Sequence, residues 1–362
     1  MAVAWISNRE VPLERAAEHA AALLHSSRCP VFSLDTDIHG TRAAIALAER
    51  VGASYDHVDG AALARETALI TDRGGMFVSP GEVRRRADVV AIVGELPEAH
   101  HRFVADLAGT VPDLGGANRR EFFLIGDGGR QAPLLGGRKP TRLSCAEGGL
   151  GGVLAALRAQ CAGRQVSAQV SNFAQFKDAL TSARFPVFLF SGFSADGLAL
   201  EMLQGLLADL NKTSRASGLL LPARESGWGS ALASTWMTGF PLRAGFTRGF
   251  PEYDPWRFEA GRQLAEGETD LHLWISANGN VPAAGNGGAR LIVLAKTTQP
   301  FAGADVTLAI GQAGVDHDGV AYSSRTGSLA FVAATAASQR PSAATILRLI
   351  AGRIPAEAAL PC

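Results

Sequence analysis

A short segment, residues 35–40, concentrates side chains that could bind a metal ion: Asp35, Thr36, Asp37, Ile38, His39 and Gly40. Two carboxylates and one imidazole alternate within five positions, and both kinds of side chain are common metal ligands. The same spacing suits a helix start, because carboxylates near a helix N-terminus accept hydrogen bonds from unpaired backbone amides. We favour this second interpretation, with Asp35 and Asp37 capping a helix from Thr41, and keep the metal site as the alternative.

Two other histidine clusters carry less information. Asp316, His317 and Asp318 precede a glycine, and this composition is typical of a turn. His100 and His101 follow an acidic stretch, and we expect them to be exposed. The Gly-x-Ser-x-Gly pattern of a nucleophile turn is absent from the sequence. Folding can still bring a Ser/His/Asp triad together, but a hydrolase has no anchor residue here.

Residues 224–256 combine large rings with glycine and proline. Trp228, Trp236 and Trp256 lie there with five glycines and three prolines. Glycine permits positive φ and proline removes a backbone donor, so we expect a long ordered loop. That loop would form the floor of a cleft between two domains or a surface excursion held by its tryptophans.

Composition narrows the class of protein. The 362 residues are 47% hydrophobic, which is enough for more than one core. The 34 basic and 34 acidic residues cancel, so neither nucleic acid nor an anionic membrane is an expected partner. The four cysteines lack metal-binding spacing and are expected to be free thiols. No signal peptide and no apolar run of the ~18 residues of a membrane span is present, so we expect a soluble cytoplasmic protein.

The elements that position these residues alternate between short apolar strands and helices. Residues 30–34 and 55–58 have strand character, and a helix over 41–51 between them ends at Gly52. This β-α-β unit predicts parallel pairing with a right-handed crossover. The segment 35–40 then follows the carboxyl end of its strand, where open α/β sheets bind ligands.

The same alternation continues along the chain and predicts an α/β protein with doubly wound, mostly parallel sheets. We expect a first α/β lobe over 1–164, a second α/β lobe over 165–300 that contains residues 224–256, and a closing segment over 301–362 with a C-terminal helix. Further strands are expected at 89–93, 121–126, 186–192, 218–221, 271–275, 291–294, 306–310 and 329–332, and further helices at 13–27, 80–86, 96–108, 173–182, 195–210, 257–264 and 343–353.

Five segments occur in an order that resembles a known family. They are VFSLDTDIHGTRAAIALAERVGA, RADVVAIVGELP, ESGWGSALASTWMTGFPLRAGFTRGFPEYDP, GETDLHLWISAN and FAGADVTLAIGQAGVDHDGVAYSSRTG. The order resembles the B-type subunit of formylmethanofuran dehydrogenase, a branch of the molybdopterin oxidoreductases, over most of the chain. The most specific pieces are WMTGFP at 236–241 and RGFP at 248–251. The resemblance implies a multi-lobed, molybdopterin-oxidoreductase-like architecture.

The departures from that family concern its redox groups. Its redox members bind an iron–sulfur centre through cysteines and place a cysteine or selenocysteine on the metal after the first strand. Here the matching loop is 35–40, which has no thiol, and residues 1–28 contain no cysteine. Molybdenum and tungsten favour sulfur donors, and iron–sulfur clusters need thiolates. The resemblance therefore implies a degenerate pterin and metal loop, with no cofactor or metal held by this chain, and makes Trp228, Trp236, Thr238 and Phe240 candidates to lie in the former cleft.

Without redox groups the chain most resembles the B-type subunits of bacterial formyltransferase/hydrolase complexes. This implies a non-catalytic structural subunit in the one-carbon pathway from formaldehyde to formate. It also implies three partners: an amidohydrolase-like zinc subunit, a formyltransferase subunit and a chain like the C-type subunit of formylmethanofuran dehydrogenase. The complex would use a methanofuran-like carrier, tetrahydromethanopterin and zinc in other subunits. Because such a carrier has a polyglutamate tail, Arg224, Arg243 and Arg248 are candidates to guide it, with ordinary surface arginines as the alternative.

Two other functions stay open at this level. An active molybdo- or tungstopterin oxidoreductase subunit could use His39 as an unusual ligand. A stand-alone α/β protein could bind a nucleotide or a sugar. The fold is compatible with all three functions, so the choice depends on the missing sulfur ligands and on the resemblance.

Overall fold

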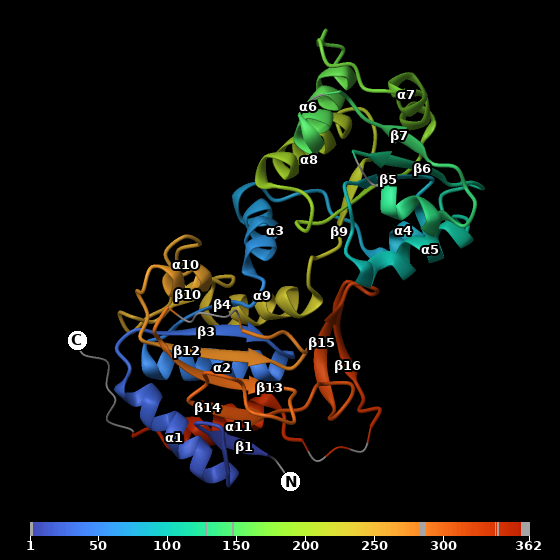
Figure 1. Ribbon diagram of the computed structural model, residues 1–362. Coiled ribbons are helices and arrows are strands. Elements are labelled where there is room, and N and C mark those ends of the chain that lie inside the picture. The colour runs from blue at the N-terminus through green and yellow to red at the C-terminus, as the bar shows by residue number, and fades with distance from the viewer. Residues whose placement is uncertain are drawn as a thin grey trace. The chain divides into compact units, whose positions relative to one another are not determined.

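The computed structural model (Figure 1) describes residues 3–126, 129–146, 148–282, 287–336, 338 and 340–355. The chain forms two compact units built from segments that lie apart in the sequence. Unit 1 consists of Met1–Ala64, Arg224–Tyr322 and Leu329–Cys362, and unit 2 of Arg65–Ala223 and Ser323–Ser328.

This division differs from the expected lobes at 1–164, 165–300 and 301–362. Strand β3 (Pro30–Asp35) pairs in parallel with β12 (Leu271–Ser276), which brings distant parts of the chain into one sheet. Most of unit 2 is therefore inserted between two strands of unit 1. Local periodicity identifies strands but does not show which strands pair, so the sequence pattern carried no sign of the insertion.

Unit 1 is built on one sheet, whose other strands are β1 (Ala4–Ile6), β2 (Arg9–Val11), β4 (Ser54–His57), β10 (Ala244–Gly245), β11 (Glu252–Tyr253), β13 (Arg290–Ala295) and β14 (Val306–Ala309). In the described residues its order is β11-β10-β4-β3-β12-β13-β14-β1-β2. The central strands from β4 to β14 are parallel, and antiparallel strands extend both edges. The predicted parallel pairing of β3 with β4 is confirmed.

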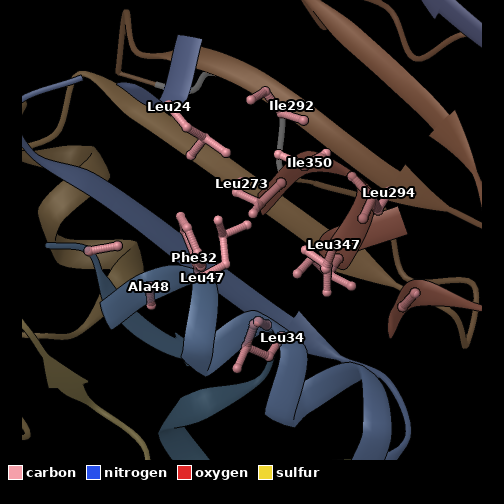
Figure 2. Close-up of a cluster of buried hydrophobic side chains, with 14 of the residues drawn as sticks. Leu24, Phe32, Leu34, Leu47, Ala48, Leu273, Ile292, Leu294, Leu347 and Ile350 are labelled. Carbon is pink, nitrogen blue, oxygen red and sulfur yellow. The ribbon is translucent and has the colours of Figure 1, made fainter. Parts of the chain in front are cut away.

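One face of this sheet carries the main core of unit 1. The helices of the unit are α1 (Leu13–Ser26), α2 (Ile38–Val51), α9 (Glu225–Thr238), α10 (Ala260–Ala265) and α11 (Ala343–Ala351). Figure 2 shows side chains of α1, α2 and α11 meeting those of β3, β12 and β13. The labelled residues are Leu24, Phe32, Leu34, Leu47, Ala48, Leu273, Ile292, Leu294, Leu347 and Ile350. Full burial of each leucine, isoleucine or phenylalanine side chain among them stabilises the fold by ~1.5–3 kcal/mol, relative to leaving it exposed.

Local sequence signals set the ends of α2. The Asp37 side chain accepts a hydrogen bond from the Gly40 amide at 2.9 Å, which confirms the predicted helix cap. Gly52 follows the helix with a φ of 67°, a conformation that glycine adopts at little energetic penalty. The helix begins at Ile38, three residues before the predicted start.

Unit 2 contains a fully parallel sheet in the order β7-β6-β5-β8-β9 within the described residues. Its strands are β5 (Val89–Val93), β6 (Glu121–Ile125), β7 (Thr141–Leu143), β8 (Pro186–Phe190) and β9 (Ser217–Leu220). The helical segments are α3 (Gly60–Arg73, divided between the units), α4 (Pro80–Arg86), η1 (Glu98–His100), α5 (His101–Gly109), η2 (Gly129–Leu135), α6 (Gly149–Cys161), α7 (Phe173–Ser182) and α8 (Gly197–Leu210). Alternate residues of β5 belong to two different apolar clusters, so both faces are covered. The predicted doubly wound α/β architecture is confirmed. A separate two-stranded sheet, most of which belongs to unit 1, joins β15 (Gly319–Ser323) and β16 (Ser328–Val332).

The expectation of a long loop over 224–256 is wrong for its first half. Residues 225–238 form α9, which ends at Gly239 with a φ of 83°. Gly227 and Gly229 allow this helix to pack closely against its neighbours. A Cβ at Gly227 would come within 3.4 Å of His57, and one at Gly229 would come within 3.4 Å of Ile38 and Tyr322. The prolines all lie beyond Gly239 and do not interrupt the helix. Within the described residues, no helix combines the length and apolar character needed to cross a membrane.

Candidate functional site

On β3 and β12, most side chains on the face opposite the main core are polar, whereas on β13 that face is apolar. Residues of β3 and β12 alternate, so those between the core positions of Figure 2 point to the opposite side. These residues are Val31, Ser33, Asp35, His272, Trp274 and Ser276, and all are buried. Buried polar groups need hydrogen-bond partners, so this face is the first place to look for a site.

Asp35 holds the chain that follows β12. Its Oδ2 accepts hydrogen bonds from Ser276 Oγ at 2.9 Å and Asn280 Nδ2 at 2.6 Å, and its Oδ1 accepts from Asn278 Nδ2 at 2.7 Å. The carboxylate is 1% exposed. Asp35 therefore does not cap α2 as expected, because it is the last residue of β3 and its side chain is directed toward β12 and the residues after it.

A cavity of about 470 Å³ lies on the same polar face, beside β3, β4 and β12. Its lining includes charged, imidazole and aromatic groups from several elements of unit 1. The polar and aromatic lining residues are Ser33, Asp56, His57, Asp59, Arg243, Glu259, His272 and Trp274. A volume of this size is within the range of small-molecule sites.

Arg243 is the central charged group of the cavity. Its Nε lies 3.2 Å from Asp56 Oδ2, its Nη2 lies 3.5 Å from Glu259 Oε1, and its Nη1 donates to the Pro255 carbonyl at 2.7 Å. The residue is 8% exposed and has a φ of 65°, which is uncommon for a residue other than glycine. Burial raises the pKa of Asp56 to about 6, and the guanidinium of Arg243 opposes that rise.

The two histidines of the cavity are held by other groups. His57 Nδ1 accepts a hydrogen bond from the Asp59 amide at 3.1 Å, and its Nε2 lies 3.3 Å from Ser226 Oγ. Burial lowers the pKa of His57, and Asp35 at 3.9 Å opposes the effect. Because Nδ1 accepts a hydrogen bond, the neutral ring carries its proton on Nε2. His272 Nε2 lies 2.8 Å from Ser33 Oγ inside the sheet, in agreement with a structural role.

The segment 35–40 does not bring its candidate ligands together. Asp35 is bonded across the sheet, Asp37 caps α2, and His39 is exposed on the helix. A Cβ at Gly40 would overlap the Thr36 side chain, so the turn is already filled. Within the described residues, no group of three His, Cys, Asp or Glu side chains is placed to hold a metal ion.

This donor set does not fit molybdenum or tungsten. The segment offers no sulfur, its buried carboxylate already accepts three hydrogen bonds, and its imidazole is on the surface of a helix. We therefore derive no chemistry through such a metal at this position.

The aromatic candidates make contacts within unit 1. Trp228 lies against Tyr322 with ring centroids 6.5 Å apart, and Phe240 stacks on Tyr253 at 6.0 Å. Thr238 Oγ1 donates to the Ser234 carbonyl at 2.9 Å, as part of the helix end. Trp236 differs from them because it is 58% exposed. The expectation that Trp236 fills a cleft within this chain is therefore wrong.

Only two of the three candidate arginines are exposed. Arg224 Nε lies 3.0 Å from Asp59 Oδ2, and Arg248 pairs with Glu252 on the surface. Arg243 is buried in the cluster with Asp56 and Glu259, so it cannot stand on an exposed rim as the sequence suggested.

The remaining clusters have structural roles. Asp316 accepts from the Gln312 amide at 2.9 Å and Asp318 from the Ala334 amide at 2.8 Å, in agreement with the predicted turn. The expectation of an exposed His100 is wrong, since this side chain is 1% exposed and its Nε2 lies 2.8 Å from the Pro222 carbonyl oxygen.

Sequence reasoning missed several residues of the polar face. Asp56, Glu259, Asn278 and Asn280 were not singled out, although Asp56 lies within β4, Glu259 precedes α10, and the two asparagines follow β12. The run Ser-Tyr-Asp-His in β4 was a usable signal, because charged and polar residues rarely lie in a buried strand without partners.

Comparison with known proteins places this geometry in a family. No family model matches the sequence. The B-type subunit of the formyltransferase/hydrolase complex Fhc of Methylorubrum extorquens is 33% identical over 359 residues, which cover 97% of this chain and 98% of that protein. This chain belongs to the family of Fhc B-type subunits.

Solved and more distant relatives agree with this assignment. A chain in the crystal structure of the M. extorquens formyltransferase/hydrolase complex FhcABCD, in complex with methylofuran, matches with a TM-score of 0.88 and 31% identity. The match covers 97% of this chain and 98% of that one. The B-type subunit of tungsten-containing formylmethanofuran dehydrogenase 2 is 24% identical in Methanococcus maripaludis and 26% identical in Methanocaldococcus jannaschii. The aligned region spans 65% of each of these archaeal proteins, so the Fhc family is the fuller match.

Proposed function

We propose that this chain is the B-type subunit of a formyltransferase/hydrolase complex of one-carbon metabolism and serves there as a structural subunit. The observation that carries the proposal is the match to the Fhc B-type subunit over nearly the whole of both chains, in sequence and in structure. The segment 35–40 supports it, because its two carboxylates are hydrogen-bonded within the fold and it offers no sulfur donor.

The proposed partners are those of such a complex. They are an amidohydrolase-like zinc subunit, a formyltransferase subunit and a chain like the C-type subunit of formylmethanofuran dehydrogenase. The complex would pass formyl groups between tetrahydromethanopterin and a methanofuran-like carrier. It would hold zinc in another subunit and would be located in the cytoplasm. The solved relative in complex with methylofuran supports the choice of carrier.

A guiding role for surface arginines is part of the proposal. Arg224 and Arg248 are exposed and each is paired with one carboxylate, so a polyanionic carrier tail could replace that partner. Arg243 would contribute to stability instead, because Asp56 and Glu259 surround it in the interior.

Purification of the tagged chain from its own host tests the proposal. We expect native mass spectrometry to find it with three other polypeptides, and elemental analysis to find zinc in the assembly. A chain that purifies alone would contradict the role as a subunit. Stoichiometric molybdenum or tungsten in the isolated chain would instead support the redox alternative.

A further inference from the structure

A groove of about 380 Å³ in unit 1 is lined by residues of α2, the end of α9 and α11. Most of its lining comes from one stripe of α2, in which residues three or four apart share a helix face. The lining residues are His39, Arg42, Ala43, Ala46, Leu47, Arg50, Met237, Leu347, Arg348 and Ala351.

The charge in this groove has one sign. Three arginines and one histidine line it, and no Asp or Glu is among the described lining residues. Arg42 and Arg348 are exposed, and neither forms an ion pair with a described residue. The whole chain has 34 basic and 34 acidic residues, so this is a local concentration of positive charge. It is complementary to an acidic partner.

The groove also has apolar surface. Ala43, Ala46 and Ala351 are small and leave room between the arginines, while Met237 is 40% exposed. Trp236 precedes Met237 on the last turn of α9 and is 58% exposed. Exposed tryptophan, methionine and arginine together are the composition of protein interfaces, where such residues are enriched.

The helices that frame the groove are fixed by the core beneath it. Leu47 of α2 and Leu347 of α11 line the groove, and both belong to the buried cluster of Figure 2. A partner can therefore bind without a rearrangement of these helices, which lowers the entropic penalty of association.

We propose that this groove is the docking site for an acidic, amphipathic segment of another protein subunit of the same complex. The inference rests on the proposed function. Carboxylates of the segment would pair with Arg42, Arg50 and Arg348, and its apolar side chains would cover Met237 and Trp236. A purely anionic ligand such as a polyglutamate tail would leave that apolar surface exposed, so a protein segment accounts for more of the observations.

Variants of the intact complex test the proposal. The double variant Arg42→Glu/Arg348→Glu reverses two charges, and Ala46→Phe narrows the groove without changing its charge. The matched control is Arg15→Glu, which reverses one exposed arginine on α1 outside the groove lining. Each tagged variant is purified with its partners from the host, and circular dichroism of the tagged chain checks that it is folded.

We expect both groove variants to lose at least about tenfold of one co-purified subunit, while Arg15→Glu retains it. Carbodiimide cross-linking of the wild-type complex should join Lys residues of that subunit to Glu49, an exposed carboxylate of α2. Unchanged co-purification in both groove variants would overturn the proposal while leaving the subunit function intact. A wild-type chain without partners would contradict both.

Two other occupants give different results. If free poly-L-glutamate binds the wild-type complex and Arg42→Glu/Arg348→Glu abolishes only that binding, the groove is a polyanion site and the proposal is wrong. If native mass spectrometry shows that the variants lose a second copy of this chain instead of another subunit, the occupant is the chain itself and the proposal is again wrong.

Discussion

Arg243 Nε lies 3.2 Å from Asp56 Oδ2, and this ion pair is buried beneath the polar face of the unit 1 sheet. The two residues come from segments that lie far apart in the sequence, next to β10 and at the end of β4, which are adjacent in the sheet. The backbone of Arg243 has a φ of 65° at this point. A positive φ is strained for a residue other than glycine, so the contacts of Arg243 must offset that backbone strain.

Removal of the guanidinium should destabilise unit 1 strongly. We expect Arg243→Met to lower the free energy of unfolding by about 3–5 kcal/mol, because Asp56 would remain as a buried and unpaired carboxylate. The double variant Arg243→Met/Asp56→Asn should recover part of that loss. Urea unfolding of the two single variants and the double variant measures the coupling, and strictly additive effects would show that the pair does not interact.

The buried carboxylate of Glu66 should make the stability of unit 2 depend on pH. Burial raises the pKa of Glu66 from 4.5 to about 7, although the amides of Ala223 and Gly192 oppose the rise. Between these values the folded protein retains a proton that the unfolded chain has lost. The contribution of Glu66 to stability is therefore fully present below about pH 4.5 and is lost as pH rises toward 7, a change of about 3 kcal/mol by linkage.

The variant Glu66→Gln tests this pH dependence. Its amide oxygen can accept the same hydrogen bonds but cannot titrate, so the difference between pH 5 and pH 8 should become smaller than in the wild type. Asp56 is present in both proteins, so its own effect cancels in the comparison. Equal pH dependence of urea unfolding in the two proteins would show that Glu66 does not carry a raised pKa.

Glycine substitutions should separate close packing from helix propensity. A Cβ at Gly60 would overlap Asp56 Oδ1 and push the carboxylate away from Arg243, so we expect Gly60→Ala to lose about 1–3 kcal/mol. A Cβ at Gly261 in α10 would have no atom within 4 Å, so Gly261→Ala should gain about 0.5–1 kcal/mol. Thermal unfolding of the two variants compares them, and a tolerated Gly60→Ala would contradict the close approach.

Asp35 should control the order of the chain after β12. The variant Asp35→Ala leaves Ser276, Asn278 and Asn280 without their shared acceptor, and we expect a loss of about 2–4 kcal/mol from three broken hydrogen bonds. Hydrogen exchange at residues 277–282 should become faster. The control Asp37→Ala removes the helix cap and a long hydrogen bond from Thr36, and should lose about 1 kcal/mol without affecting that segment. Unchanged hydrogen exchange in Asp35→Ala would show that the hydrogen bonds to Asp35 do not order residues 277–282.

The exposed arginines should affect the carrier rather than stability. Because surface ion pairs contribute only about 0–1 kcal/mol, Arg224→Ala and Arg248→Ala should leave unfolding almost unchanged. If they guide an acidic carrier, turnover by the whole complex should fall, most clearly at low ionic strength where charge attraction is least screened. If both variants turn over like the wild type at low salt, Arg224 and Arg248 do not guide the carrier and only form surface ion pairs.

The sequence alone determined local elements such as β3 and α2, because strand and helix periodicity and the helix-end residues Asp37 and Gly52 act over a few neighbouring residues. The tertiary structure decided three further features. Because β3 pairs in parallel with β12, residues 65–223 are an insertion that forms most of unit 2. No local sequence pattern predicts that pairing. Residues 225–238 form α9 in spite of their glycines, and the helix packs closely against His57, Ile38 and Tyr322 at Gly227 and Gly229. The polar face, with Asp35 bonded to Asn278 and Arg243 paired with Asp56, depends on contacts between residues far apart in the chain, and only the folded sheet brings those side chains within hydrogen-bonding distance.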